Sequence, residues 1–440
     1  MAAVERPQLR LSTLRASRAV VTRDPLVRNS VFLMATTVAN SLLGFAYWVV
    51  AARLFPTSTI GLAAAFIAAF SMAAMIANPA VHSGLTQALP RSGSGPEWSA
   101  LVNGGLILGT AASVVIGALV GVILPVVSPE FASVTRSGLS FAGFVAGVVG
   151  VVAGIIVDYT FVAERSSGVM FVRNVAFGVA KIPLLFVALA VSGRHSSTGI
   201  WGGWVAATLV TIAAAVVVGF PYLGRGYRLV VEGGGRRMRA LVRDLAGHHV
   251  TNLGCLLPMY VMPVEVVARV SSQANAYFYV TWMLCSLFFM VSPSVASSLF
   301  AEGSHDPAAI RRTALRSARI TGLLLVAPMA GYLLLGRFVL GIYGAGYARN
   351  GTGLLMVLVA SAVPDAVTNL YVSVLRVERR LVESSVLNVG MAVIAIVGAW
   401  LLLPPLGIVG AGLAWLIAQS AGTVWTLLWV WRREMAAVPA

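Results

Sequence analysis

Apolar segments long enough to cross a bilayer recur along this chain of 440 residues, and they limit its fold more than any other feature. A helix needs about 20 mostly apolar residues to span the hydrocarbon core of a membrane. Twelve such segments can be placed, near 30–52, 59–80, 100–125, 139–157, 169–191, 200–220, 247–268, 276–299, 317–335, 352–375, 384–403 and 408–430. The sequence therefore predicts an all-α polytopic membrane protein with twelve transmembrane helices.

Composition supports this class. Only 10% of the residues are charged and 58% are hydrophobic, whereas a soluble domain usually carries about 25% charged residues. The net charge of +16 would suit a nucleic-acid binder, but the arginines lie at the ends of apolar spans rather than on a soluble surface. We therefore expect membrane lipids, and no nucleic acid, as the partner of this positive charge.

An arginine-rich segment divides the twelve spans into two groups of six. It holds six arginines, together with three glycines at 233–235. The expected organisation is a cytoplasmic Arg-rich tail over 1–28, a six-helix bundle over 29–220, a basic cytoplasmic connector over 221–246, a second bundle over 247–432 and a cytoplasmic tail over 433–440.

The placement of arginine predicts the orientation. With a cytoplasmic N-terminus, 24 arginines fall on the cytoplasmic side and six on the other, as the positive-inside rule expects. Residues 1–28 have no apolar core, so they do not resemble a cleavable signal peptide. We expect a multi-pass protein of the cytoplasmic membrane with both termini in the cytoplasm.

A weak internal repeat relates the two halves. Residues 162–174 (VAERSSGVMFVRN) align with 376–388 (RVERRLVESSVLN) at an offset of 214. The matching polar pairs are Glu164 with Glu378, Arg165 with Arg379, and Asn174 with Asn388. Both segments fall on the predicted cytoplasmic side, which indicates two parallel, pseudo-symmetric bundles with a shared cavity between them.

Lys181 is the first candidate for a functional residue, because it is the only lysine in the chain and lies in the fifth span. A charge at mid-membrane costs about 2.5–3.5 kcal/mol on insertion scales. Asn174 precedes Lys181 by seven residues and therefore shares its helix face. The ammonium either lines a cavity and attracts a phosphate or pyrophosphate, or extends toward the interface.

A polar stripe in the tenth span is the second candidate. Asp365, Asn369 and Arg376 share one face of this helix, beside Pro364. Such a stripe should face the bundle interior or water. Asp365 would either neutralise a cation (Lys181 or an arginine) or take up a proton during transport, and the alternative is a purely structural hydrogen-bonded contact.

Three further groups of residues complete the set. Asn40 in the first span and Asn252 in the seventh would face each other in a pseudo-symmetric bundle. The cluster of Asp158, Glu164, Arg165 and Arg173 is either an entrance for a sugar-phosphate headgroup or a local salt-bridge cluster. Cys255 and Cys285 have no pairing or metal-ligand spacing, so we expect two small buried hydrophobic residues.

Catalytic motifs are missing. The sequence has no P-loop, no HExxH and no nucleophile elbow. We therefore expect no enzyme activity, no metal and no cofactor.

Four stretches resemble the polysaccharide-biosynthesis branch of the multidrug/oligosaccharidyl-lipid/polysaccharide (MOP) flippase superfamily. They are GLTQALPRSGS after the second span, LFAEGS after the eighth, YGAGYARNG after the ninth and LYVSVLRVERR at the end of the tenth. The resemblance covers residues 29–432 and implies a MOP-flippase-like fold with a cavity open to one face at a time. It further implies movement of undecaprenyl-pyrophosphate-linked oligosaccharide from the cytoplasmic to the outer leaflet, for surface polysaccharides such as lipopolysaccharide.

The cavity in that family is typically cationic, and Lys181, Arg173 and Arg28 are the positions here that would supply the charge. The residues that we expect to contact the substrate are Lys181, Asn174, Arg173, Asp365, Asn369, Arg376, Asn252 and Asn40. We expect a monomer, with the lipid-linked oligosaccharide as substrate and a polymerase or glycosyltransferases of the same pathway as further partners.

Two alternatives stay open. A cation-coupled multidrug antiporter would share the fold, although that branch typically relies on an acidic residue in the first helix, and Ser30 to Ala52 contains none. A membrane-embedded sugar polymerase or ligase would need carboxylates or histidines on an outer loop, where Glu130, Glu265 and His195 are widely scattered.

Overall fold

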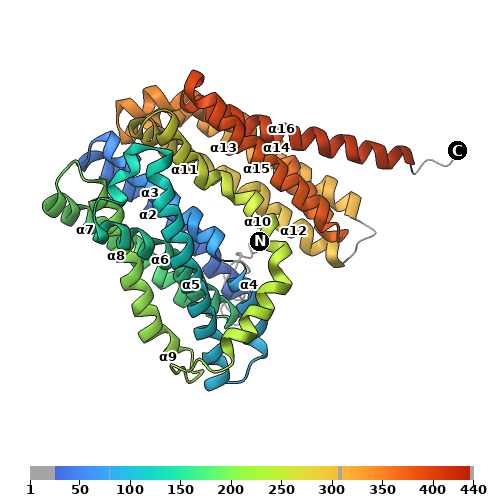
Figure 1. The fold of residues 1–440 in the computed structure, drawn as a ribbon. Coiled ribbons are helices and arrows are strands. Elements are labelled where there is room, and N and C mark those ends of the chain that lie inside the picture. The colour runs from blue at the N-terminus through green and yellow to red at the C-terminus, as the bar shows by residue number, and fades with distance from the viewer. Residues whose placement is uncertain (1–24, 79, 306–309, 437–440) are drawn as a thin grey trace, which may run out of the picture.

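The computed structural model describes residues 25–78, 80–305 and 310–436, and all of the regular structure in these ranges is helical (Figure 1). The first half contains α2 (Pro25–Leu54), α3 (Thr57–Ala77), α4 (Val81–Ala88), α5 (Pro96–Val127), α6 (Gly138–Ala163), α7 (Ser167–Ser192), α8 (Ser197–Ala214) and α9 (Phe220–Tyr222). The second half contains α10 (Gly234–Arg269), α11 (Ser272–Phe289), α12 (Val291–His305), α13 (Ile310–Tyr343), α14 (Ala345–Val377), α15 (Leu381–Leu406) and α16 (Ile408–Ala436).

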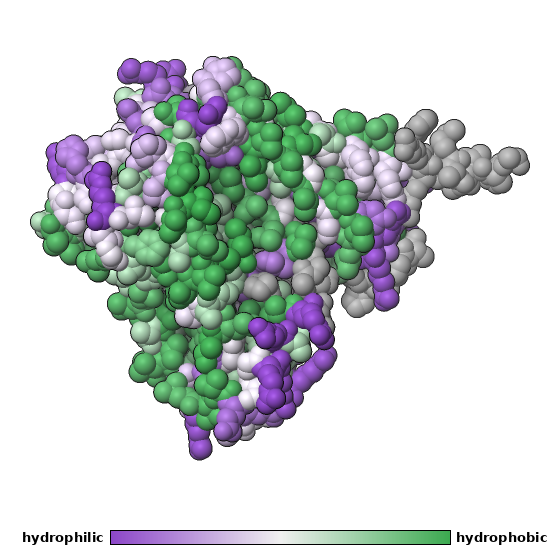
Figure 2. Space-filling model, in the orientation of Figure 1, coloured by the Kyte–Doolittle hydropathy of each residue, from purple (hydrophilic) through white to green (hydrophobic). Residues whose placement is uncertain are grey.

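Among the described residues, ten helices are long and apolar enough to cross a membrane, and the bent pair α11 and α12 passes the same test of length and composition when its two helices are taken together. The remaining predicted span, 247–268, lies on α10. Figure 2 shows the visible surface of these helices to be largely hydrophobic, with hydrophilic residues gathered toward the ends. The predicted fold class, an all-α multi-pass membrane protein, is confirmed.

Two predicted spans differ from straight helices. The eighth span, 276–299, is bent by about 40° between α11 and α12. The second predicted span, 59–80, is too long, because α3 ends at Ala77. Neither Asn78 nor Ala80 has an α-helical conformation. Ala80 adopts a left-handed φ of 62°, which interrupts the helix and lets the chain turn into α4.

The internal repeat is reproduced in the backbone. Arg165 and Arg379, 214 residues apart, both adopt left-handed φ angles, of 53° and 59°. The turns that hold them have the same hydrogen bonds: Ser166 N donates to Phe161 O, and Arg380 N donates to Leu375 O, each at 2.8 Å. These bonds satisfy carbonyls at the ends of α6 and α14, so the two halves share the same helix-to-helix corner.

Helix pairing also repeats between the halves. The pairs α2–α7, α5–α6 and α7–α8 of the first half correspond to α10–α15, α13–α14 and α15–α16 of the second. The chain therefore consists of two parallel, pseudo-symmetric bundles.

The two halves meet where α3 crosses α11. A Cβ atom on Gly61 would lie 1.7 Å from the carbonyl oxygen of Ser272, so the helices approach here as closely as their backbones allow. The side-chain amide of Asn275 donates to Gly61 O at 2.7 Å. Positions 61 and 275 are 214 residues apart, which places this contact on the pseudo-two-fold axis. It lies near the starts of α3 and α11, at the predicted outer end of the bundles.

Helix α10 joins the two halves as one long helix (yellow-green in Figure 1). Its first turn packs on α5, where a Cβ on Gly234 would lie 1.8 Å from Ala100 O. Further along, Gly254 packs against the backbone of Asn388 in α15. The segment predicted as a connector is therefore helical from Gly234 onward, while the domain boundaries stay predictions.

The non-helical part of the connector is held on the first half. Asn103 of α5 donates its side-chain amide to Arg228 O and Val230 O, at 3.0 and 2.9 Å. Tyr227 donates its hydroxyl to Asn103 Oδ1 at 2.9 Å. One buried asparagine therefore binds residues 227–230 of the segment that leads into α10.

Candidate functional site

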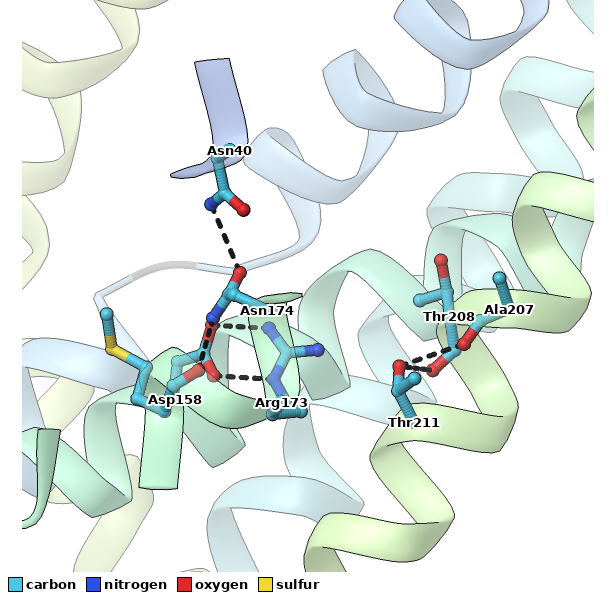
Figure 3. A network of polar contacts seen from close by, with 8 residues as sticks. Asn40, Asp158, Arg173, Asn174, Ala207, Thr208 and Thr211 are labelled. Atoms are coloured by element: carbon cyan, nitrogen blue, oxygen red, sulfur yellow. Dashed lines mark hydrogen bonds and ion pairs between the residues drawn. The ribbon is translucent and has the colours of Figure 1, made fainter. Parts of the chain in front are cut away.

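A buried polar network joins α2, α6 and α7 in the first half (Figure 3). Arg173 donates to both carboxylate oxygens of Asp158, with its Nε 2.6 Å from Oδ1. The Asn174 amide donates to Asp158 Oδ2 at 3.1 Å, and Asn40 donates to Asn174 Oδ1 at 3.3 Å. Three of the predicted site residues therefore lie together, arranged around a carboxylate.

This arrangement neutralises Arg173. The Arg173 and Asp158 side chains are only 10% and 16% exposed, and the two-pronged contact is the strong form of a charge-assisted hydrogen bond. Within the polar network the Arg173 charge is offset by that of Asp158, so Arg173 does not act there as an uncompensated cation.

Glu164 and Arg165, predicted in the same cluster, belong elsewhere. Glu164 accepts from Arg225 of the connector and from Trp98 Nε1, both at 2.8 Å. Arg165 is exposed and forms no ion pair with a described residue. Sequence reasoning missed the roles of Trp98 and Arg225, because nothing in the sequence shows that the connector folds back onto the α6–α7 corner.

Lys181 is 9% exposed and lies on the inner side of α7. Its Nζ is 4.9 Å from the ring centroids of Tyr47 and Phe177, within the range of a cation–π interaction. No described residue gives it a hydrogen bond or an ion pair. The Tyr47 hydroxyl is also buried without a hydrogen-bond partner in the described chain. Two unsatisfied polar groups thus lie on adjacent helices, α2 and α7.

Asp365 lies in the other half. Its Oδ2 accepts from the Ser292 hydroxyl at 2.7 Å, and Asn369 donates its amide to Asp365 O at 2.9 Å. Thr368 donates to Gln419 Oε1 at 2.8 Å. No ion pair joins Asp365 to Lys181 or to another described cation.

These C-terminal polar residues surround a cavity of about 40 Å³, lined by Asp365, Thr368, Asn369, Asn388, Gln419 and Cys255. This is room enough for water molecules or one small ion. Sequence reasoning missed Ser292, Thr368 and Gln419. A lone amide in an apolar span, as at Gln419, was a usable signal, whereas the serine and threonine were not distinctive.

The other predicted site residues are dispersed. Arg376 is half-buried at the end of α14, and Asn252 is exposed on α10. No hydrogen bond joins Asn252 to Asn40 in the described chain. Cys285 is buried as predicted, but the prediction for Cys255 is wrong, because it is exposed on the face of α10 that borders the polar cavity.

A second cavity, of about 120 Å³, lies between the halves. Side chains of α3, α10 and α11 line it, most of them aromatic or sulfur-containing: Met259, Tyr260, Phe278, Tyr279, Trp282 and Met283. The described residues contain no group of three or more His, Cys, Asp or Glu side chains placed to hold a metal ion.

Comparison with known proteins shows the fold. No family model and no curated protein matches the sequence. Among solved structures, the chain resembles the lipid II flippase MurJ in an inward closed conformation, with 12% identity, a TM-score of 0.70, and coverage of 91% of this chain and 87% of that one.

An inward-facing multidrug resistance MATE family transporter of the MOP superfamily is similar at 15% identity and a TM-score of 0.65, with coverage of 90% and 95%. A MOP superfamily transporter from Pyrococcus furiosus matches at 16% identity and a TM-score of 0.59, with coverage of 94% and 96%. The chain therefore has the fold of the MOP superfamily transporters.

Proposed function

We propose that this protein is a flippase that moves undecaprenyl-pyrophosphate-linked oligosaccharide across the cytoplasmic membrane by alternating access. One observation supports this substrate class most directly. Lys181, the single lysine, is buried in the first bundle, and no described carboxylate forms an ion pair with it. A cation kept uncompensated inside a membrane protein is costly, and such residues usually mark a substrate path.

The chemistry of the site suits a diphosphate. An ammonium provides three donors and a compact charge, and the adjacent Tyr47 hydroxyl provides another donor. Among the described residues, the Lys181 charge interacts with the faces of Tyr47 and Phe177. An entering diphosphate would replace these weak contacts with charge-assisted hydrogen bonds.

The remaining predicted residues have supporting roles in this proposal. Arg173 and Asn174, fixed by Asp158, keep α7 in register with α2 and so position Lys181. The polar cavity around Asp365 would couple substrate movement to uptake of a proton or another cation. The lipid tail would stay in the bilayer while the headgroup crosses, with both termini in the cytoplasm.

Transport by reconstituted protein tests the proposal. In proteoliposomes, Lys181→Met should slow flipping of a fluorescent lipid-diphosphate oligosaccharide by roughly 10–100-fold, the value of one lost charge-assisted hydrogen bond. Lys181→Arg should keep part of the rate. The matched control is Arg349→Gln, which removes one positive charge from an exposed position. A wild-type rate in Lys181→Met would remove Lys181 from the substrate path.

A cation-coupled multidrug antiporter is the second candidate. The aromatic and methionine-rich cavity between α3, α10 and α11 is the observation that favours it, because such walls bind flat apolar cations. Against it, α2 contains no acidic residue. Drug efflux from cells that produce the protein, together with absent lipid flipping, would favour the antiporter over the flippase.

A further inference from the structure

A groove of about 700 Å³ opens on the outside of the first half, away from Lys181 and the cavity between the halves. It lies among the start of α2, the α6–α7 turn, the start of α7 and the junction of α8 with α9. Its walls are mostly apolar, with Phe32, Phe171, Val172 and Val218 among them. Val172 and Val218 are 64% and 69% exposed, so these walls belong to the surface that a bilayer would cover.

One end of the groove is cationic. Arg28 and Arg165 both line it, both are exposed, and neither forms an ion pair with a described residue. Arg165 is held in position by the left-handed corner between α6 and α7. Two uncompensated guanidinium groups therefore border an apolar channel at the predicted cytoplasmic end of the bundle.

The start of α7 adds hydrogen-bond donors to this end. Asn29 Oδ1 already accepts from the backbone N–H of Ser167 at 3.1 Å. Ser167, which is only 1% exposed, is also among the residues that line the groove, and its buried hydroxyl has no hydrogen-bond partner in the described chain. The first turn of a helix also carries partial positive charge. An unsatisfied hydroxyl, a helix start and two arginines together favour a bound anion.

We propose that this groove binds an anionic phospholipid of the leaflet on the connector side, with its phosphate between Arg28 and Arg165 and one acyl chain along Phe32, Phe171 and Val218. Arginine suits the headgroup because its planar fork pairs with phosphate oxygens. The apolar walls suit a hydrocarbon chain but not a free anion. The site does not depend on which substrate the protein transports.

Native mass spectrometry of the purified full-length protein with phosphatidylglycerol and phosphatidylcholine tests this site. The wild type should prefer phosphatidylglycerol. Arg28→Gln/Arg165→Gln should weaken phosphatidylglycerol binding by at least about tenfold. Each arginine near a membrane surface strengthens binding of anionic lipid several-fold, and this variant removes two of them. The matched control is Arg91→Gln/Arg319→Gln, which removes two exposed arginines outside the groove and should bind as the wild type does.

A second variant tests the apolar wall. Val218→Trp leaves both arginines in place and fills the channel, so it should also lose phosphatidylglycerol while remaining monodisperse. Equal binding of phosphatidylglycerol by the groove and control double variants would overturn the proposal. Displacement of phosphatidylglycerol by millimolar inorganic phosphate would also overturn it, because the groove would then be a free-anion site.

Discussion

At the scale of single residues, the two candidate cations of α7 have opposite environments although they are eight positions apart. Arg173 is enclosed with Asp158, whereas Lys181 lies near two aromatic rings and forms no ion pair within the described part of the chain. The first arrangement stabilises the bundle, and the second leaves a charge available to a ligand. Residue type alone does not distinguish them, so the sequence predicted both as substrate contacts.

Loss of Asp158 should therefore reduce stability more than it reduces substrate affinity. Asp158→Asn leaves the Arg173 charge buried and uncompensated, which should lower the free energy of unfolding by about 3–5 kcal/mol. Thermal unfolding in detergent measures this. Glu97→Gln is the matched control, since Glu97 pairs with Arg237 at the exposed surface, where an ion pair contributes little to stability.

The double variant Asp158→Asn/Arg173→Met completes the test. Removing both charges should restore most of the stability, because a buried pair can often be replaced by apolar groups at little cost. If the double variant is as unstable as Asp158→Asn, the uncompensated charge of Arg173 is not the cause of the lost stability.

Asp365 should give transport its pH dependence. Asp365→Asn keeps the hydrogen bond to Ser292 possible but cannot bind a proton, so the transport rate should become flat between mildly acidic and mildly alkaline pH. Asn388→Ala is the matched control, because Asn388 lines the same cavity and does not titrate. It should lower the rate without changing the shape of the pH profile. An unchanged profile in Asp365→Asn would exclude a titrating role.

At the scale of helices, the sequence predicted the internal repeat better than it predicted where a membrane-spanning helix bends or breaks. The match of Glu164 and Arg165 to Glu378 and Arg379 indicated equivalent corners, and the backbone confirms them. The sequence analysis did not predict the bend between α11 and α12, although Pro293, just after the break, was a usable signal because proline interrupts a helix. The pairing of Glu164 with Arg225 could not be predicted from the sequence, because it depends on how the connector folds back onto α6.

The crossing of α3 and α11 should be intolerant of any side chain at position 61. In Gly61→Ala, the new Cβ would meet Ser272 O, so the two helices must separate. Spin labels on Ser58 and Gln273, both exposed, should report a longer and broader distance distribution. Gly390→Ala, a helical glycine with open space around it, should leave the distribution unchanged. If Gly61→Ala and Gly390→Ala gave the same distance distribution, close packing at position 61 would not determine the separation of α3 and α11.

At the scale of the whole molecule, the two halves meet at the predicted outer end as well as along α10, and the polar cavity of the second half borders an exposed face of α10. Besides the contact between α3 and α11, Arg53 of α2 donates to Ile342 O of α13 at 3.0 Å. Composition and periodicity predicted the two bundles, but they carry no information on which end is closed. That property depends on contacts between residues far apart in the chain.

Cysteine labelling in sealed vesicles measures from which side of the membrane the polar cavity is accessible. An impermeant maleimide should modify Cys255 from the connector side of sealed vesicles, because Cys255 is exposed beside the polar cavity. Cys285, fully buried, should not react. Cys255→Ser should abolish the signal, and Cys285→Ser should keep it. Labelling only from the opposite side would mean that the resting state opens toward the outer leaflet.

The continuity of α10 restricts how the two halves can move. Its first turns are wedged against Ala100 of the first half, and its later turns lie along Asn388 of the second. A rigid helix that contacts both halves would prevent them from rotating against each other, and Gly234 and Gly235 add no free hinge because they lie inside α10. The prolines inside it, Pro258 and Pro263, interrupt its hydrogen-bond ladder between those anchors. In the proposed alternating-access cycle, α10 must therefore flex at its prolines, or its first turns must detach from α5.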